Sequence, residues 1–351
     1  MMRPISLNVM TLYADLSQRS AIRDVRPGSI STKTDKRKKY LYAVHKDGQA
    51  RLQRYLGPAE SADAQKEAER IRQAEEEAKQ LRKTVSLLKQ SRIPAPTLVQ
   101  GRILEVLANA GLFDRGLTLV GTVAYQTYAC VVGAHLGAAA YATNDIDISV
   151  AEFVAGEQEE EIGSILKRAD PTFKPHWHAT DKLPRIFKST NFQVDVLTRH
   201  GRGRKSPVLI EPLGCAAAAL SFQEYPVEDT IEVVALYGSG VTVRVPSPTR
   251  YAIHKLIVAQ QRGSIELSKK RKDLHQAKEL LDILIETDEH ALQDSLDEAR
   301  DRGRSWKSAI NASLKEIGRD VRQGRLPLPV NKIEPKTIQK RNGKLPEKSG
   351  K

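Results

Sequence analysis

The sequence predicts an α/β fold of the α+β type, in which a small mixed sheet is flanked by helices. A short apolar run at 117–120 has the length of a buried strand, and an apolar segment with helical character follows at 123–132. Polar and apolar residues alternate over 144–148 and again over 191–198, as they do in half-buried strands. After Pro248, apolar residues recur at helical spacing, which indicates a C-terminal helical region.

The composition indicates a globular protein with an anionic partner. The chain has 351 residues, enough for one large or two modest domains, and aromatic residues make up only 5%, so the core must be mostly aliphatic. The net charge of +13 suits nucleic acid before other partners. The two cysteines, Cys130 and Cys215, lie in Ala-rich surroundings. We interpret them as small buried residues in a reduced compartment and not as part of a disulfide scaffold.

The chain carries no signal for a membrane. Residues 1–16 contain charges and no long apolar core, so they do not resemble a signal peptide. No stretch approaches an uninterrupted membrane span. We expect a cytoplasmic protein without a membrane partner, and the sequence carries no signal for an oligomeric state.

The N-terminal region is predicted to hold a helix at 9–22, a basic hairpin and one long charged helix at 62–91. The hairpin starts after 36–39 and turns at Asp47-Gly48, a two-residue turn signal. Its lysines and tyrosines could contact nucleic acid, but a solvated hairpin that packs its tyrosines on a neighbour is the favoured interpretation. The long helix has apolar residues at helical spacing and suits a brace.

A Pro-containing linker at 93–96 marks the clearest domain boundary. A helix at 99–110 follows it. Near the other end, one helix is expected over 289–321, and the Pro- and Lys-rich end has no periodicity, so it reads as a disordered basic tail that could contact nucleic acid. The predicted regions are the hairpin and long helix (1–98), the core (99–245), the helical region (246–324) and the tail (325–351).

Three carboxylates are the candidate chemistry of the core. Side chains alternate along a strand, so Asp145 and Asp147 share one face while Ile146 and Ile148 point into the core. Asp195 lies on the polar face of the later strand. Neighbouring carboxylates repel each other, and a hard cation such as Mg²⁺ relieves the repulsion while also taking phosphate oxygens. By itself, the Asp-x-Asp pair is a weak signal, and a strand that ends in two solvated aspartates is the favoured interpretation of the pair alone.

The Gly121-Thr122 turn before a helix offers backbone N–H groups to a phosphate. Together with Asp145, Asp147 and Asp195, this turn resembles the nucleotidyltransferase superfamily of DNA polymerase beta. Members carry a Gly-Ser or Gly-Gly turn, then Asp-x-Asp or Asp-x-Glu on a strand, then a third carboxylate on a later strand.

The resemblance extends over about 99–285. The helices after Pro248 look like the C-terminal part of bacterial nucleotidyltransferase-like proteins, including abortive-infection-type toxins. Two departures stand out. Threonine replaces the serine of the turn but keeps the hydroxyl, and the spacing from Gly121 to Asp145 is longer than in polymerase-type members, as in the toxin-type members.

The resemblance implies roles for seven residues. The metals, Mg²⁺ or Mn²⁺, would bind to Asp145, Asp147 and Asp195, and Asp195 would also help to activate the acceptor hydroxyl. The NTP would be held by Gly121, Thr122, Lys255 and, less securely placed, Lys272. A second interpretation of Lys255 is a surface lysine on an amphipathic helix.

The implied function is metal-dependent transfer of a nucleoside monophosphate from an NTP, an activity of the EC 2.7.7 type. The acceptor stays open between RNA, protein and a small molecule. The alternative is a catalytically inactive protein of the same fold that binds nucleic acid or serves as a toxin–antitoxin or phage-defence component. The presence of all three carboxylates favours the enzyme.

Two further segments invite a functional interpretation. The residues His176-Trp177-His178 suggest a metal site, but no third ligand lies at a helpful spacing, so a packed Trp between two half-exposed histidines is favoured. The basic loop at 199–205 is either disordered or lines a phosphate path. The chain contains no P-loop, no dinucleotide-binding fingerprint and no Cys-x-x-Cys pair.

Overall fold

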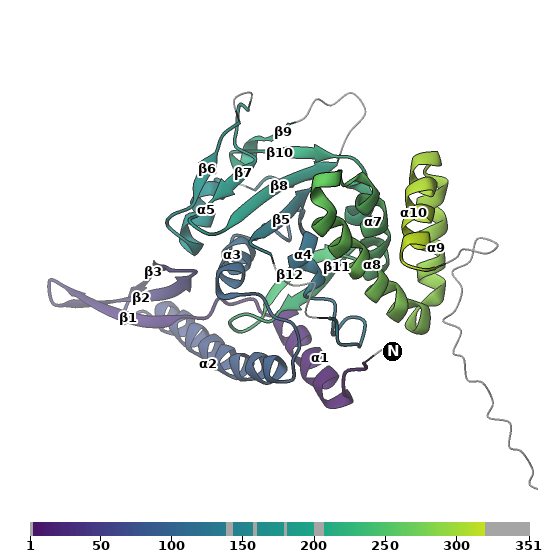
Figure 1. Cartoon of the computed structure of the whole chain (residues 1–351). Coiled ribbons are helices and arrows are strands. Elements are labelled where there is room, and N and C mark those ends of the chain that lie inside the picture. Colours follow the sequence, from purple (N-terminus) through teal and green to yellow (C-terminus); the bar gives the residue numbers. More distant parts are fainter. Residues whose placement is uncertain (1–2, 138–142, 157–159, 179–180, 200–206, 320–351) are drawn as a thin grey trace, which may run out of the picture.

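The computed structural model describes residues 3–137, 143–156, 160–178, 181–199 and 207–319. A mixed sheet lies at the centre of the molecule, with strand order β4-β5-β8-β10-β9 (Figure 1). The first half of β8 also pairs with β7, which carries β6 at its outer side. The predicted α+β fold with flanking helices is therefore confirmed. The strands are β4 (Leu117–Val120), β5 (Asp145–Val150), β6 (Lys174–His176), β7 (Ile186–Lys188), β8 (Gln193–Arg199), β9 (Val208–Ile210) and β10 (Cys215–Leu220).

The predicted alternation decides which face of the sheet is buried. In β8, Val194 and Val196 are fully buried, whereas Gln193 and Asp195 between them are partly exposed. In β5, Ile146 and Ile148 are likewise buried. One face of these strands therefore packs into the core, and the other presents polar side chains.

Helices cover the sheet, and further helices follow its last strand toward the C-terminus. Helix α3 begins with a capping box between Thr97 and Gln100 and packs on α5. Helix α7 has Pro248 in its first turn and packs along α8. The helices of this part are α3 (Leu98–Asn109), α4 (Gly121–Tyr125), α5 (Ile162–Ala169), α6 (Glu224–Glu228), α7 (Pro248–Gln261), α8 (Leu267–Thr287), α9 (Glu289–Asp301) and α10 (Arg304–Glu316).

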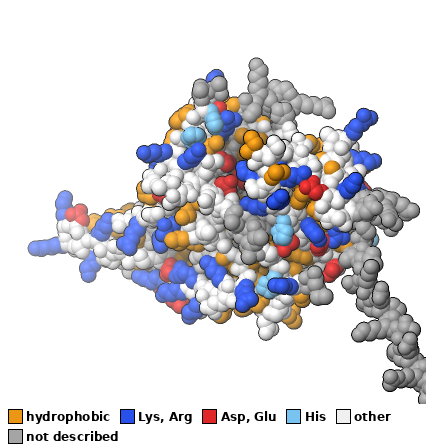
Figure 2. All heavy atoms as spheres, viewed as in Figure 1, with side chains coloured by type: hydrophobic (Ala, Val, Ile, Leu, Met, Phe, Trp, Pro, Cys, Tyr) orange, Lys and Arg blue, Asp and Glu red, His pale blue; other side chains and the backbone are white. Residues whose placement is uncertain are grey.

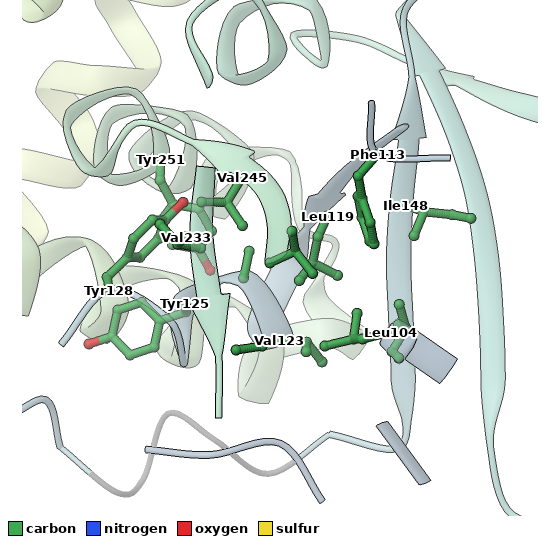
Figure 3. Close-up of a cluster of buried hydrophobic side chains, with 14 of the residues drawn as sticks. Leu104, Phe113, Leu119, Val123, Tyr125, Tyr128, Ile148, Val233, Val245 and Tyr251 are labelled. Carbon is green, nitrogen blue, oxygen red and sulfur yellow. The ribbon is translucent and has the colours of Figure 1, made fainter. Parts of the chain in front are cut away.

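The hydrophobic core joins the sheet to a separate hairpin, β11 (Thr230–Ala235) and β12 (Val241–Pro246). Strand β12 lies against β4 and α3. Aliphatic side chains from α3, β4, β5 and the hairpin meet three buried tyrosines (Figure 3). The tyrosine rings of Tyr125, Tyr128 and Tyr251 lie 5.1–6.5 Å apart and form an aromatic cluster beneath α7.

The N-terminal region forms a three-stranded antiparallel sheet and two helices. The predicted hairpin is present as β2 and β3, and β1, which the sequence did not reveal, pairs with β2. Leu16 of the first helix and Leu81 and Leu88 of the second belong to the same core as the central sheet. The boundary near residue 98 therefore stays a prediction. These elements are α1 (Leu7–Ala21), β1 (Ser29–Asp35), β2 (Lys38–Asp47), β3 (Ala50–Pro58) and α2 (Ala62–Gln90).

A buried carboxylate fastens one end of the three-stranded sheet to the core. Asp47, at the end of β2, lies 2.8 Å from Arg26 and 2.6 Å from Arg168 of α5. The side-chain amide of Asn109 donates to it at 2.8 Å, and the Gln49 N–H donates to the Arg168 carbonyl oxygen at 2.7 Å. The opposite end of the sheet projects from the body of the molecule (Figure 1).

Two predicted helices differ from the structure. The segment 123–132 is helical only up to Tyr125. Residues 123–130 are all buried, so their apolar character reflects burial and not the apolar stripe of a helix. The segment 289–321 is not one helix. It breaks between α9 and α10 at Gly303, whose φ of 140° suits glycine alone.

Two predicted segments, the tail at 325–351 and most of the basic loop at 199–205, lie outside the described residues. Among the helices that the structure does describe, none combines the length and the apolar character that crossing a bilayer requires.

Candidate active site

The three predicted carboxylates lie on adjacent strands. Strands β5 and β8 pair in parallel, with Asp147 opposite Asp195 and Asp145 opposite Gln193. Directly opposite residues of neighbouring strands point to the same face, so the three aspartates share one side of the sheet. That side opens into a cavity of ≈ 310 Å³. All seven residues singled out from the sequence line it: Gly121, Thr122, Asp145, Asp147, Asp195, Lys255 and Lys272.

The carboxylates destabilise each other's charge. Burial, followed by the charges of Asp145 and Asp195, raises the pKa of Asp147 to about 7, although Lys255 and Arg262 act in the opposite direction. Burial also raises the pKa of Asp195. A group of acids whose charges are only partly compensated, lining a cavity, is a site where a cation would be stabilised.

Two neighbouring side chains hold the outer carboxylates. The Gln193 side-chain amide lies 2.6 Å and 2.8 Å from the two oxygens of Asp195, and the Thr143 hydroxyl donates to Asp145. Within the described ranges, no group of three acidic, His or Cys side chains is arranged so that it could hold a metal ion. The carboxylate chemistry fits Mg²⁺ or Mn²⁺, and convergence of the three aspartates on a shared metal stays a prediction.

The Gly121-Thr122 turn lies directly beside the Asp147 side chain. Antiparallel pairing of β4 with β5 sets Val120 opposite Asp147, so the next residue lies beside the carboxylate. Gly121 has a φ of +68°, and a Cβ there would collide with the Asp147 side chain. The Tyr251 hydroxyl donates to the Gly121 carbonyl oxygen at 2.9 Å and lies 3.0 Å from Gln276, which ties the turn to α7 and α8.

Lys255 is not a surface lysine, so the second interpretation of this residue is wrong. Its side chain is buried, and its Nζ lies 2.6 Å from Oδ1 of Asp273 on α8. The Arg262 Nε lies 3.1 Å from Oδ2 of the same carboxylate. Burial opposes the charge of Asp273, but the two cations outweigh it and hold the pKa of Asp273 below its usual value. Lys255 of α7 and Arg262, directly after this helix, thus both pair with an acid on the next helix.

Further side chains of α7 and α8 complete this wall of the cavity. Lys269 and Lys272 line it, and burial, followed by the charge of Lys255, lowers the pKa of Lys272. His254 also lines it, and its Nε2 is buried without a hydrogen-bond partner among the described residues. Burial, with Lys255 beside it, lowers the pKa of His254 to about 3, so the ring is neutral.

Sequence reasoning missed part of this wall. The sequence predicts Lys255 but not Tyr251, although Tyr251 precedes Lys255 by four positions and helical spacing could have revealed that the two share a face. No sequence signal marks His254 or the pairing of Asp273, because both depend on how α7 and α8 pack. In the space-filling view, acidic side chains near the middle of the face lie beside a group of Lys and Arg side chains over α7 and α8 (Figure 2).

One of three comparisons with known proteins assigns the chain to a family. No curated protein is significantly similar to the chain in sequence. A solved structure, ANT(2")-Ia in complex with adenylyl-2"-tobramycin, matches with 13% identity over 57% of this chain and 94% of that chain. Its TM-score is 0.32, so this likeness carries no argument about fold or substrate. A family model described as nucleotidyltransferase matches residues 98–301, more than half of the chain, and this range includes the sheet, the three aspartates and the cationic wall. The chain belongs to this nucleotidyltransferase family.

Proposed function

We propose that the protein is a metal-dependent enzyme of the polymerase-beta type that transfers a nucleoside monophosphate from an NTP to an acceptor hydroxyl. One observation carries the proposal. The same cavity holds the three aspartates on one wall and four cationic side chains, Lys255, Arg262, Lys269 and Lys272, on the other. An anionic triphosphate and a divalent cation together would neutralise both walls.

Each wall has its own task in this proposal. Asp145 and Asp147 would hold the metal, and Asp195, on the neighbouring strand and likewise partly exposed, would orient the acceptor hydroxyl and take up its proton. Thr122 and the backbone of Gly121 would orient the phosphates. Bound Mg²⁺ or Mn²⁺ would supply charge neutralisation of the triphosphate and a lower pKa of the acceptor hydroxyl.

The cationic wall would hold the triphosphate as point charges. Lys269 and Lys272 reach the cavity from α8, whereas the Lys255 ammonium is already bonded to Asp273. Lys255 would therefore act on the phosphates through its positive charge and by fixing the wall in place, and not as a free clamp.

The test is a labelling experiment. The pure protein is incubated with Mg²⁺ and each α-labelled NTP, together with total cellular RNA, protein or a small-molecule fraction. We expect label in one of these fractions, and we expect Asp147→Asn to abolish it. Asp301→Asn, which changes an exposed aspartate at the end of α9, is the matched control and should retain the activity.

A contrary result would be equally clear. Labelling by Asp147→Asn at the wild-type rate would overturn the assignment of the site. Retention of cellular RNA by the protein, with no transfer of label from any NTP, would favour the alternative of a catalytically inactive nucleic-acid-binding protein.

A further inference from the structure

The polar face of the sheet continues beyond Asp195. In the antiparallel pair β7–β8, Ile186 lies opposite Asp195, and in the pair β6–β7, His176 lies opposite Ile186. At the other edge of β8, Asp147 of β5 lies opposite Asp195. A row of directly opposite residues therefore crosses β5, β8, β7 and β6 on one face of the sheet. Neighbouring strands are about 4.8 Å apart, so His176 lies about 10 Å from the backbone of Asp195.

A second row beside the first carries two lysines. Gln193 lies opposite Asp145 in β5 and opposite Lys188 in β7, and Lys188 lies opposite Lys174 in β6. Both lysines are exposed, whereas Phe187 between these positions is buried in the core, which confirms the assignment of the two faces. The Lys188 charge reaches the site, since it lowers the pKa of Asp195 against the larger, opposite effect of burial.

An exposed aromatic residue directly follows one strand of this surface in the chain. Trp177 directly follows β6 and is 53% exposed, so the packed Trp expected from the sequence is wrong. The rings of His176 and His178 are 5.5 Å apart, centroid to centroid. In the part of the chain that the structure describes, neither Lys174 nor Lys188 forms an ion pair. We call Lys174, His176, Trp177, Ile186 and Lys188 the β6–β7 platform.

We propose that the β6–β7 platform binds the acceptor, and that this acceptor is a single-stranded polynucleotide whose terminal hydroxyl reaches Asp195. The inference rests on the proposed function and specifies its acceptor. Two exposed ammonium groups suit phosphates, and exposed indole and imidazole rings suit the stacking of bases. A polycationic acceptor would be repelled by the same lysines.

The arrangement separates two anionic substrates. The cationic wall of α7 and α8 lies on one side of the aspartates, and the platform lies on the other, at the end of the sheet away from these helices (Figure 1). In the transfer, the terminal hydroxyl oxygen forms a bond to the α-phosphorus of the NTP. The bond from this phosphorus to the bridging oxygen breaks, pyrophosphate leaves, and the hydroxyl proton passes to Asp195.

Binding can be measured without any transfer. Fluorescein-labelled single-stranded RNA and DNA oligonucleotides of one sequence are titrated with the full chain in the absence of NTP, and anisotropy is recorded at several salt concentrations. We expect Lys174→Ala/Lys188→Ala to weaken binding at least tenfold and to reduce the slope of log K against log salt by about 1.4, which is two phosphate contacts at about 0.7 each. The control Lys66→Ala/Lys307→Ala removes two exposed lysines elsewhere and should leave the slope within a few tenths of the wild-type value.

The aromatic contribution has a different signature. Trp177→Ala should weaken binding about tenfold with an unchanged salt slope, and Trp177→Phe should restore most of the loss, because stacking needs a ring and not a charge. The comparison of RNA with DNA shows which polynucleotide the platform prefers. Thermal unfolding of each variant checks that these exposed substitutions leave the fold intact.

The outcomes separate this inference from the proposed function. Platform variants that bind both oligonucleotides like the wild type or like the control overturn the platform, even where labelling succeeds. Platform-dependent binding that persists in Asp147→Asn supports it, even where no transfer is found. Label that appears only on protein or on a small molecule, at a rate unchanged by Lys174→Ala/Lys188→Ala, also overturns it and leaves the nucleotidyl transfer intact.

Discussion

At the scale of single residues, the contact between Gly121 and Asp147 decides how closely the turn approaches the site. Gly121→Ala adds a methyl group that collides with the carboxylate, whereas Gly133→Ala introduces the same residue at nearly the same φ, +67°, with nothing within 4 Å. Both variants carry the cost of positive φ, on the order of 1 kcal/mol. We expect only Gly121→Ala to lower nucleotidyl transfer, by at least tenfold. Equal transfer rates in the two variants would show that the close approach is not needed.

The ion pair of Lys255 and Asp273 is predicted to stabilise the folded protein, in addition to its proposed effect on the bound triphosphate. Lys255→Met should lower the free energy of unfolding by about 3 kcal/mol, because the buried Asp273 loses the closer of its two ion-pair partners among the described residues. The surface pair of Lys278 and Asp282, at 2.8 Å, supplies the control, and Lys278→Met should cost less than about 1 kcal/mol. Urea unfolding measures both, and similar costs for the two variants would contradict the buried pair.

His254 is predicted to give the stability of the protein a dependence on pH. Its pKa is about 3 in the folded chain, against an ordinary histidine value of 6.5, mainly because of burial, with Lys255 and Arg262 also disfavouring the proton and Asp273 favouring it. Between these values the unfolded state binds more protons, so stability falls as the pH falls below about 6.5. We expect His254→Gln to reduce this fall between pH 6.5 and 4, as measured by denaturant unfolding. An identical pH profile for the two proteins would remove His254 as the cause.

At the scale of elements, the anchor of the three-stranded sheet is the point where the N-terminal region is most strongly held. Asp47→Ala removes contacts to Arg26, Arg168 and Asn109 and should cost about 2 kcal/mol, because it removes hydrogen bonds between a buried carboxylate and two charged groups. Asp35→Ala, at an exposed position of β1, is the control and should be nearly neutral. Hydrogen exchange should accelerate in β2 and β3 of the Asp47 variant only, and protection equal to the wild type would contradict the anchor.

The elements also show which parts of the fold could be predicted from the sequence. The strands β5 and β8 were predictable because each alternates by itself, which placed Asp145 and Asp147 on one face of their strand and Asp195 on the polar face of its own. The pairing that sets Asp147 opposite Asp195 is not local, and only the resemblance to a known superfamily suggested it. The strands β6 and β7 have three residues each, and they exist through their pairing with β8, so no local pattern announces them. The Lys255–Asp273 pair depends in the same way on the packing of α7 against α8. Elements with a local sequence pattern could be predicted, whereas strands and ion pairs that depend on contact between distant segments could not.

At the scale of the whole molecule, the linker at 93–96 can be tested by limited proteolysis. Arg92 is exposed and has a φ of 62°, so we expect trypsin to cut after it. Because Leu16 and Leu81 share the core with the central sheet, the two fragments should stay together in gel filtration and separate only in denaturant. Absence of a cut near residue 92 would overturn the boundary, and spontaneous separation of the fragments would contradict the shared core.

The hydrogen bond from Tyr251 to Gly121 joins positions 130 residues apart, and the Asp273 carboxylate that fixes the wall comes later still. The ribosome adds residues in chain order, and domains generally fold as units once their residues are available. The turn and the three aspartates leave the ribosome well before α7 and α8, which supply the opposite wall. A growing chain therefore carries its acids long before it can enclose a nucleotide, and chemistry at this site must wait until translation has passed α8.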